Sequence, residues 1–223
     1  MELPYTVEVY FAALAEYNRA WFPLPIVALL LALAAFALAV RPLPGRPEAS
    51  GRFVGAILAA AWLWVGWAHQ LQHMAGLNFM APVYGWAWIV QGALIALTCT
   101  APGRVRFRFV GDLRGWTGLA LALFGLLGYP LAVLALGYGW RGLPLVGTAP
   151  DPTAIFTAGL LAAARERPPL HLFVLPVAWA GVAAVSAYLL GFPLDYAVAV
   201  AVFAGMVLAV GARLRRTPDA SRM

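Results

Sequence analysis

The chain has 223 residues, of which 63% are hydrophobic and only 11% are charged. That is too little polar surface to cover a water-soluble globule, so the composition predicts a protein of the lipid bilayer. The formal net charge is +6, but the basic residues lie in short loops between apolar runs, a pattern of membrane topology signals and not of a nucleic-acid-binding face. All fifteen basic residues are arginines, which excludes a lysine Schiff base and therefore a retinal protein.

Residues 1–20 are predicted to form an amphipathic segment that lies in the membrane interface. Their apolar positions Val7, Tyr10, Phe11 and Leu14 follow the spacing of one helix face. The segment carries glutamates where a signal peptide would carry basic residues, so we expect it to remain on the mature protein.

Residues 21–212 are predicted to form one transmembrane domain of seven helices, followed by a basic cytoplasmic tail at 213–223. Most of the apolar runs have about the 20 residues that a bilayer core requires. The fifth run is clearly short and covers only about 18 Å at 1.5 Å per residue. The predicted spans are 21–40, 53–73, 83–101, 116–136, 153–164, 170–190 and 194–211.

The arginines predict the orientation of this bundle. If all seven runs cross the membrane, thirteen arginines fall on one side and only Arg19 and Arg141 fall on the other. Because arginine-rich loops stay in the cytoplasm, the predicted fold is an all-α membrane bundle with its N-terminus outside and its C-terminus inside. We expect a multi-pass protein of a bacterial inner membrane.

The second predicted span carries His69 and His73 near its outer end. On an α-helix they share a face with Gly55, Ala59 and Gly66, and small residues at this spacing let another helix approach closely. We therefore expect the two histidines to point into the bundle. Their spacing suits a metal ion, although no carboxylate stands beside them in the sequence, and a purely structural role is the alternative.

The short fifth span begins with helix-start signals. Asp151, Pro152 and Thr153 suit the N-cap, the first turn and a hydroxyl at the helix start, and Thr157 follows one turn later. The preceding loop, 137–150, is rich in glycine and proline. If this loop folds back into the protein, the helix starts below the outer surface beside a hydrated cavity, and if it rests on the surface there is no such cavity.

The predicted topology brings scattered polar side chains to a similar depth, where they would line an outward-facing vestibule. A helix N-terminus favours an anion and the outer carboxylates favour a cation, so a zwitterion or a cation held by Asp151 fits both. Capping and interfacial roles are the alternative for each residue. The candidate substrate-binding residues are Asn18, His69, Gln91, Asp151, Thr153 and Thr157, and the candidate metal ligands are His69 and His73.

Several short elements resemble the landmarks of an uncharacterised family of bacterial multi-pass membrane proteins, a domain of unknown function. The most specific is Pro152-Thr153-Ala154-Ile155-Phe156-Thr157, and the others are Tyr17-Asn18, Leu63-Trp64 with Trp67, His69, Gln91 and Gly128-Tyr129-Pro130. The resemblance covers nearly the whole chain and implies that Asn18, His69, Gln91, Thr153 and Thr157 form one site. The family pattern has cysteine in place of Asp151 and an aromatic residue in place of His73, which argues against a shared His/Cys metal site.

The sequence carries no nucleophile elbow, phosphate loop or HExxH pattern, so it gives no signature of an enzyme. We predict a transporter or channel for a small solute or ion, because three spans on either side of a central one is an arrangement of carriers built from parallel repeats. The alternatives are a membrane metal- or haem-binding protein that uses His69 and His73, or a structural subunit of a membrane complex. The expected partners are the lipid bilayer and a small solute or cation, without nucleic acid; the sequence identifies no cofactor and leaves the oligomeric state open.

Overall fold

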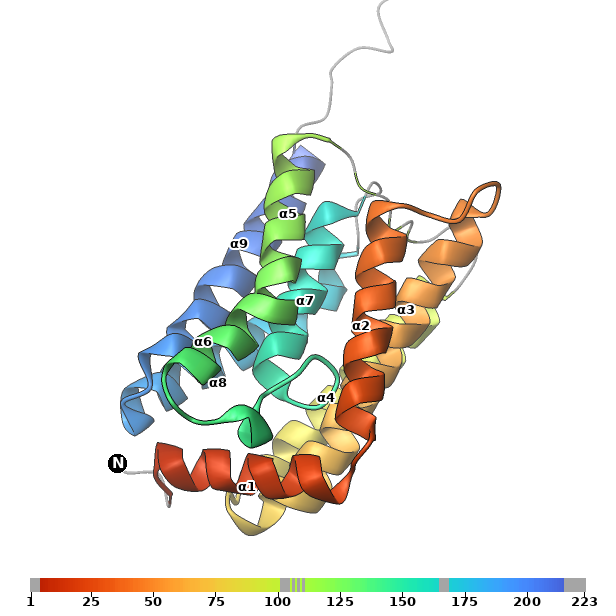
Figure 1. Ribbon diagram of the computed structural model, residues 1–223. Helices are drawn as coiled ribbons and strands as arrows, with labels where there is room; N and C mark the ends of the chain where they lie inside the picture. The colour runs from red at the N-terminus through yellow and green to blue at the C-terminus, as the bar shows by residue number, and fades with distance from the viewer. Residues whose placement is uncertain are drawn as a thin grey trace, which may run out of the picture.

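The computed structural model describes residues 5–100, 105, 107, 109, 111–164 and 169–214. This part of the chain is helical, with no extended strand, and its long helices stand side by side while α1 lies across one end of them (Figure 1). The helices are α1 (Val7–Ala20), α2 (Leu24–Val40), α3 (Pro47–Trp64), α4 (Ala81–Cys99), α5 (Leu113–Leu123), α6 (Tyr129–Ala135), α7 (Pro150–Ala163), α8 (Val174–Leu190) and α9 (Tyr196–Leu214). Shorter segments are the π-helices η1 (Val65–His73) and η3 (Phe124–Gly128) and the 3-10 turns η2 (Met74–Gly76), η4 (Trp140–Gly142), η5 (Leu170–Phe173) and η6 (Pro193–Asp195).

Five helical runs among the described residues are long and apolar enough to cross a membrane. They are Pro47–Gly76, Ala81–Cys99, Leu113–Ala135, Leu170–Leu190 and Pro193–Leu214. The pair α1 and α2, which meets at a 90° bend, would make a sixth. The all-α fold is thus confirmed, whereas seven crossings and the orientation of the termini stay predictions, since α7 has only 14 residues.

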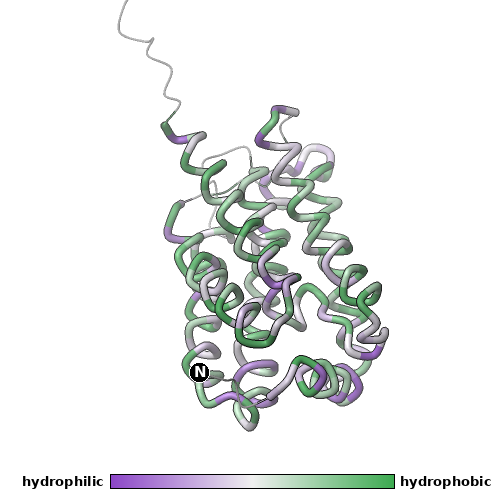
Figure 2. Tube along the Cα trace, turned by 90° about the vertical axis from the view of Figure 1, so that its left-hand side faces the viewer, coloured by the Kyte–Doolittle hydropathy of each residue, from purple (hydrophilic) through white to green (hydrophobic). Residues whose placement is uncertain are grey.

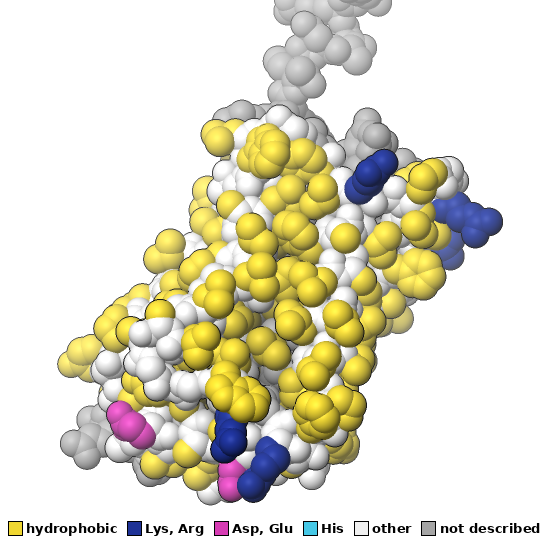
Figure 3. All heavy atoms as spheres, in the orientation of Figure 1, with side chains coloured by type: hydrophobic (Ala, Val, Ile, Leu, Met, Phe, Trp, Pro, Cys, Tyr) yellow, Lys and Arg dark blue, Asp and Glu magenta, His cyan; other side chains and the backbone are white. Residues whose placement is uncertain are grey.

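Apolar residues follow the upright helices, and hydrophilic residues gather mainly near their ends and in α1 (Figure 2). On the face shown in Figure 3, arginine side chains lie at the two ends and hydrophobic side chains cover the area between them. This distribution is the one that a bilayer selects, because charged groups are costly inside its hydrocarbon core.

Helix α1 begins at the N-cap residue Thr6 and is bent sharply away from α2. Its apolar face is buried against the end of the bundle, where Phe11 stacks on Tyr138 with 4.1 Å between the ring centroids and lies edge-on to Phe192. In this structure the apolar face of α1 therefore covers the other helices, and its place in a membrane interface stays a prediction.

Two membrane-length runs contain a π-helix where the sequence predicts ordinary α-helix. The segment η3 ends directly before Tyr129-Pro130. A proline inside a helix has no N–H and its ring clashes with the carbonyl group four residues earlier, so a wider turn before Pro130 relieves the conflict. The segment η1 carries His69 and His73. Such wide turns often occur at functional sites.

Helix α7 is enclosed by the rest of the protein, because all 14 of its residues are buried. Residues 146–149 before it are buried as well, so the loop does fold back into the protein. Two of the four N–H groups that a helix start leaves unpaired are missing here, since Pro150 and Pro152 have none. The helix packs mainly against α5 and α9.

Glycines set how closely the helices approach. A Cβ atom added at Gly66 would lie 2.7 Å from the carbonyl oxygen of Gly85, and one at Gly118 would lie 2.6 Å from the backbone nitrogen of Ala163. Only glycine permits these contacts, which hold α3–η1 against α4 and α5 against α7. The predicted close approach at Gly55 and Gly66 is confirmed, since Gly55 packs against Cys99 of α4 in the same way.

Candidate functional site

A cavity of about 650 Å³ lies at the end of the bundle that α1 covers. It is bordered by α1, the end of η1, the start of α4, the first turn of α7, one side of α8, and η6. Its lining combines apolar side chains with polar and aromatic ones that come from all of these elements. The polar and aromatic members are Tyr5, Tyr10, His69, Gln70, Asn78, Phe79, Tyr84, Asp151, Trp179, Ser186, Phe192 and Asp195.

Two carboxylates, Asp151 and Asp195, lie at this cavity and are only 7% and 9% exposed. Asp151 is the second residue of α7, and Asp195 is the last residue of η6. The indole Nε1 of Trp179 donates to Asp151 Oδ1 over 2.9 Å, and the hydroxyl of Tyr129 donates to Asp195 Oδ1 over 2.5 Å.

The cavity lining is negative, because it contains both carboxylates and, among the residues that the structure describes, no arginine. Burial raises the pKa of the Tyr5 phenol above its usual 10.0, and the charges of Asp151 and Asp195 raise it further, while a hydrogen bond to Asn78 lowers it. Tyr5 is therefore a neutral phenol at neutral pH and does not add charge. The two carboxylates dominate the electrostatics of the site.

His69 is 1% exposed and lines the same cavity. Its ring lies edge-on to Tyr17, with 5.4 Å between the ring centroids. Its Nδ1 atom has no hydrogen-bond partner of normal geometry in the described part of the chain. A buried polar atom without a partner at a cavity is a group that a ligand or a water molecule can satisfy.

A column of aromatic side chains runs from the cavity into the bundle. Trp179 and Tyr84 lie edge-on at 5.5 Å, Trp88 lies edge-on to Trp179 at 5.3 Å, and Trp62 stacks on Trp88 at 3.9 Å. The indole Nε1 of Trp62 donates to the hydroxyl of Thr157 over 2.9 Å. Thr157 therefore supports the aromatic column and does not line the cavity.

The predicted site residue Thr153 is used inside the protein. Its hydroxyl accepts from Gly147 N over 2.8 Å and donates to Ala149 O over 2.6 Å. Both hydrogen bonds hold the buried loop against the first turn of α7. Neither the hydroxyl nor the loop residue Gly147, whose φ of 87° suits glycine, lines the cavity.

Asn18 and Gln91 lie elsewhere. The side-chain amide of Asn18 donates to the carbonyl groups of Arg141 and Leu143 over 2.9 and 3.0 Å, which pins the loop after α6. The amide of Gln91 donates to Leu172 O over 2.7 Å, at the start of α8. Of the six residues predicted to form one site, the structure brings only His69 and Asp151 to this cavity.

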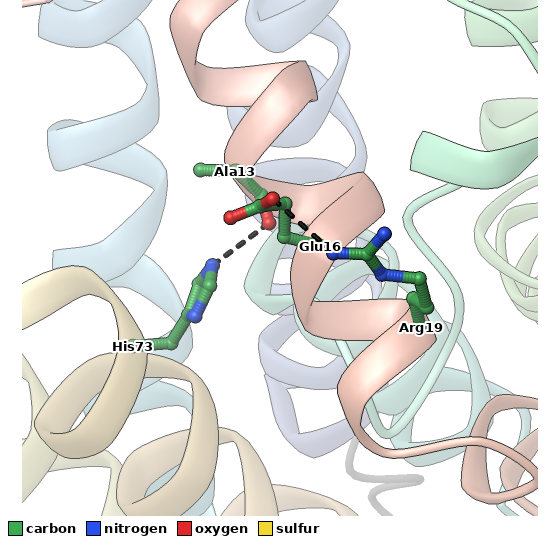
Figure 4. Close-up of polar contacts among 4 residues, drawn as sticks. All are labelled: Ala13, Glu16, Arg19 and His73. Atoms are coloured by element: carbon green, nitrogen blue, oxygen red, sulfur yellow. Dashed lines mark hydrogen bonds and ion pairs between the residues drawn. The ribbon is translucent and has the colours of Figure 1, made fainter.

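His73 points toward α1, where its Nε2 atom lies 2.8 Å from Ala13 O (Figure 4). The ion pair of Glu16 with Arg19, also visible there, lies on the exposed side of α1 with 3.4 Å between the charged atoms. Within the described ranges no group of three or more His, Cys, Asp or Glu side chains is arranged to hold a metal ion. Metal binding by His69 and His73 stays an untested prediction.

Three residues of the carboxylate site were not among the predicted site residues. Asp195 carried a signal, because an acidic residue opens the last span, but a capping role explains it equally well. Tyr129 belongs to Gly128-Tyr129-Pro130, one of the elements that resemble the family, but the sequence predicted no role for its side chain. Trp179 gave no signal, since tryptophans are common in membrane helices near the interface.

A family model described as a family of unknown function (DUF6064) matches residues 7–220. This match confirms the expected resemblance to an uncharacterised family over nearly the whole chain. No curated protein and no solved structure matches the chain.

Proposed function

The chain belongs to this family of unknown function (DUF6064), and from its cavity we propose that it is a membrane transporter that binds a small organic cation between Asp151 and Asp195. The observation that carries the proposal is a pair of buried carboxylates in a cavity whose described lining has no arginine to neutralise them. Buried carboxylates without a cation are costly, and a positively charged ligand removes that cost.

The aromatic lining supports an organic cation over a bare metal ion. Tyr10, Tyr84 and Trp179 surround the acids, and aromatic faces attract ammonium groups. Few of the lining side chains are metal ligands, and a volume of about 650 Å³ is that of a pocket for an organic molecule. The unpartnered Nδ1 of His69 offers one further polar contact to such a ligand.

The local backbone supports transport over a fixed structural role. Substrate sites of transporters are commonly built where membrane helices are short or interrupted. Here the cavity adjoins the start of the short α7 and the end of the π-helix η1, while Tyr129 follows the π-helix η3. These wide or broken turns are the places where a bundle can rearrange at low cost.

Three ligands that share a benzyl or phenyl group and differ in charge test the binding step. Benzylamine is a cation at neutral pH, benzyl alcohol is neutral and benzoate is an anion. We expect only benzylamine to raise the thermal unfolding temperature of the purified protein in detergent, by the equivalent of about 2.7 kcal/mol at one hundred times its Kd. Asp151→Asn and Asp195→Asn remove this shift, whereas Asp112→Asn, at the exposed N-cap of α5, keeps it.

Uptake of radiolabelled tetraethylammonium into proteoliposomes tests the transport step, because this permanent cation does not cross lipid unaided. We expect uptake that Asp151→Asn abolishes. Equal stabilisation by benzoate and benzylamine, or none by either, overturns the cation site. Stabilisation without uptake leaves a cation-binding protein and overturns transport.

A metal or haem protein is the weaker candidate, because the Nε2 atom of His73 is already engaged by Ala13. The metal content and visible absorption of the purified protein decide this alternative.

A further inference from the structure

Asp151 and Asp195 are buried at one cavity, and each accepts a hydrogen bond from a neutral donor. The hydroxyl of Tyr129 donates its single hydrogen to Asp195 Oδ1, and the indole Nε1 of Trp179 donates to Asp151 Oδ1. Neither donor carries a positive charge, so neither offsets the charge of a carboxylate. Two carboxylates that are buried together without a counter-charge favour the state in which one of them is protonated.

Resting on the function proposed above, we propose that Asp151 and Asp195 jointly hold one exchangeable proton in the empty cavity, and that an organic cation displaces this proton when it binds. The chain would then exchange a cation for a proton at one site. The two acids titrate as a pair, because two carboxylates buried at one cavity are not both ionised without a counter-charge.

The surroundings of the pair supply no other counter-charge. The titratable groups that face it are the phenols Tyr5 and Tyr10 from the N-terminal segment, Tyr84 from α4, and the His69 imidazole from η1. Phenols carry no positive charge, and no arginine of the described chain lines the cavity. The His69 imidazole is 1% exposed, and protonating so buried a ring is costly. A cation that enters therefore takes over the role of the shared proton.

The exchange balances without a further reactant. Before binding, the pair has one O–H and one carboxylate, with a net charge of −1. The cation binds against both acids, the O–H bond breaks, and the proton leaves to water through the cavity. The pair then has a charge of −2 and the bound cation has +1, so the net charge of the site is unchanged.

Infrared spectroscopy of the purified protein in detergent tests the shared proton without any ligand. We expect a carboxylic C=O band at neutral pH that is absent in Asp195→Asn or in Asp151→Asn, because the remaining single carboxylate ionises. Tyr129→Phe keeps the aromatic ring and removes the hydroxyl that donates to Asp195, so it should shift the band. The band should be unchanged in Asp112→Asn, which controls for loss of an exposed carboxylate. A protein without this band at neutral pH overturns the proposal.

Tetraethylammonium tests the exchange, since it has no proton of its own to gain or lose. Added to weakly buffered protein, it should release close to one proton per cation bound and remove the carboxylic band. Its Kd should rise about tenfold per unit of pH decrease on the acidic side of the release, because cation and proton compete. Binding with no proton release overturns the exchange but leaves the cation site intact. Failure of tetraethylammonium and benzylamine alike to bind overturns the proposed function, and the exchange with it, even if the infrared band is present.

Discussion

The two ends of α7 differ, although both are buried. At its start, Asp151 lies at the cavity, which is also lined by side chains of α1, η1, η2, α4, α8 and η6. At its far end, Gly159 lies so close to α5 that a Cβ atom there would collide with the backbone nitrogen of Ala122. Aromatic and acidic side chains border the cavity at the first turn of α7, whereas glycines bring α5 and η3 into close contact with the helix, from Pro152 near its start to Ala163 at its end. A single helix thus borders the cavity with its first turn and packs closely against α5 further along.

The largest expected difference between the two ends is in water access. In a Cys99→Ser background, a charged thiol reagent should label Ser186→Cys, which lines the cavity, and should not label Thr157→Cys, which is fully buried beside Trp62. Both cysteines should react after denaturation, which controls for reactivity. Labelling of Thr157→Cys in the folded protein would mean that a water path runs along α7 from the cavity to the centre of the helix.

Gly159→Ala should disturb the close packing of α7 against α5 and so lower the stability of the protein. The added methyl group meets backbone atoms, which cannot move as a flexible side chain can, so we expect a loss of about 1–3 kcal/mol of stability. The unfolding temperature in detergent measures it. Gly211→Ala in α9 is the matched control, because a Cβ atom there meets nothing and alanine favours a helix by about 0.5–1 kcal/mol. Equal effects of both changes would contradict the close packing of α5 and α7.

Thr157→Val should destabilise the centre of α7 by about 1–3 kcal/mol, because it leaves the buried indole N–H of Trp62 without an acceptor. Thr117→Val in α5 removes an exposed hydroxyl and is the matched control. The double change Trp62→Phe with Thr157→Val should recover part of the loss measured by thermal unfolding. If the stability lost in the double variant equals the sum of the losses in the two single variants, the two side chains are not coupled.

His73→Phe should have a small effect, since it removes one hydrogen bond to Ala13 and keeps an aromatic ring beside Tyr17. We expect a loss of about 1 kcal/mol. Glu16→Gln, which breaks the exposed pair with Arg19, should change stability by less than about 0.5 kcal/mol. Thermal unfolding in detergent ranks the two. A larger effect of Glu16→Gln would indicate that α1 is held by its exposed side.

Much of the helix layout follows from the sequence, and much of the site does not. Apolar runs of bilayer length predict the positions of the long helices, and the glycine-rich and proline-rich loop before α7 predicts a return into the protein. The polar residues are harder, because a hydroxyl or amide in an apolar run has many local acceptors. Thr153 bonds to the backbone of the loop just before it, whereas the contact of Asn18 with the loop after α6 depends on how α1 docks, and the meeting of Asp151 with Asp195 depends on how α9 docks. That docking is a tertiary contact which no local pattern encodes.

The shortness and full enclosure of α7 also bear on how the protein is made. A helix of 14 residues extends about 21 Å, less than the roughly 30 Å of a bilayer core, so α7 is poorly suited to rest in lipid alone. In the folded protein α7 packs against α5, which is synthesised before it, and against α9, which is synthesised after it. The carboxylate pair is likewise incomplete until η6 and α9 arrive. A nascent chain that lacks α9 therefore exposes an unfinished helix and half a site, which is the kind of intermediate that membrane quality-control proteases remove.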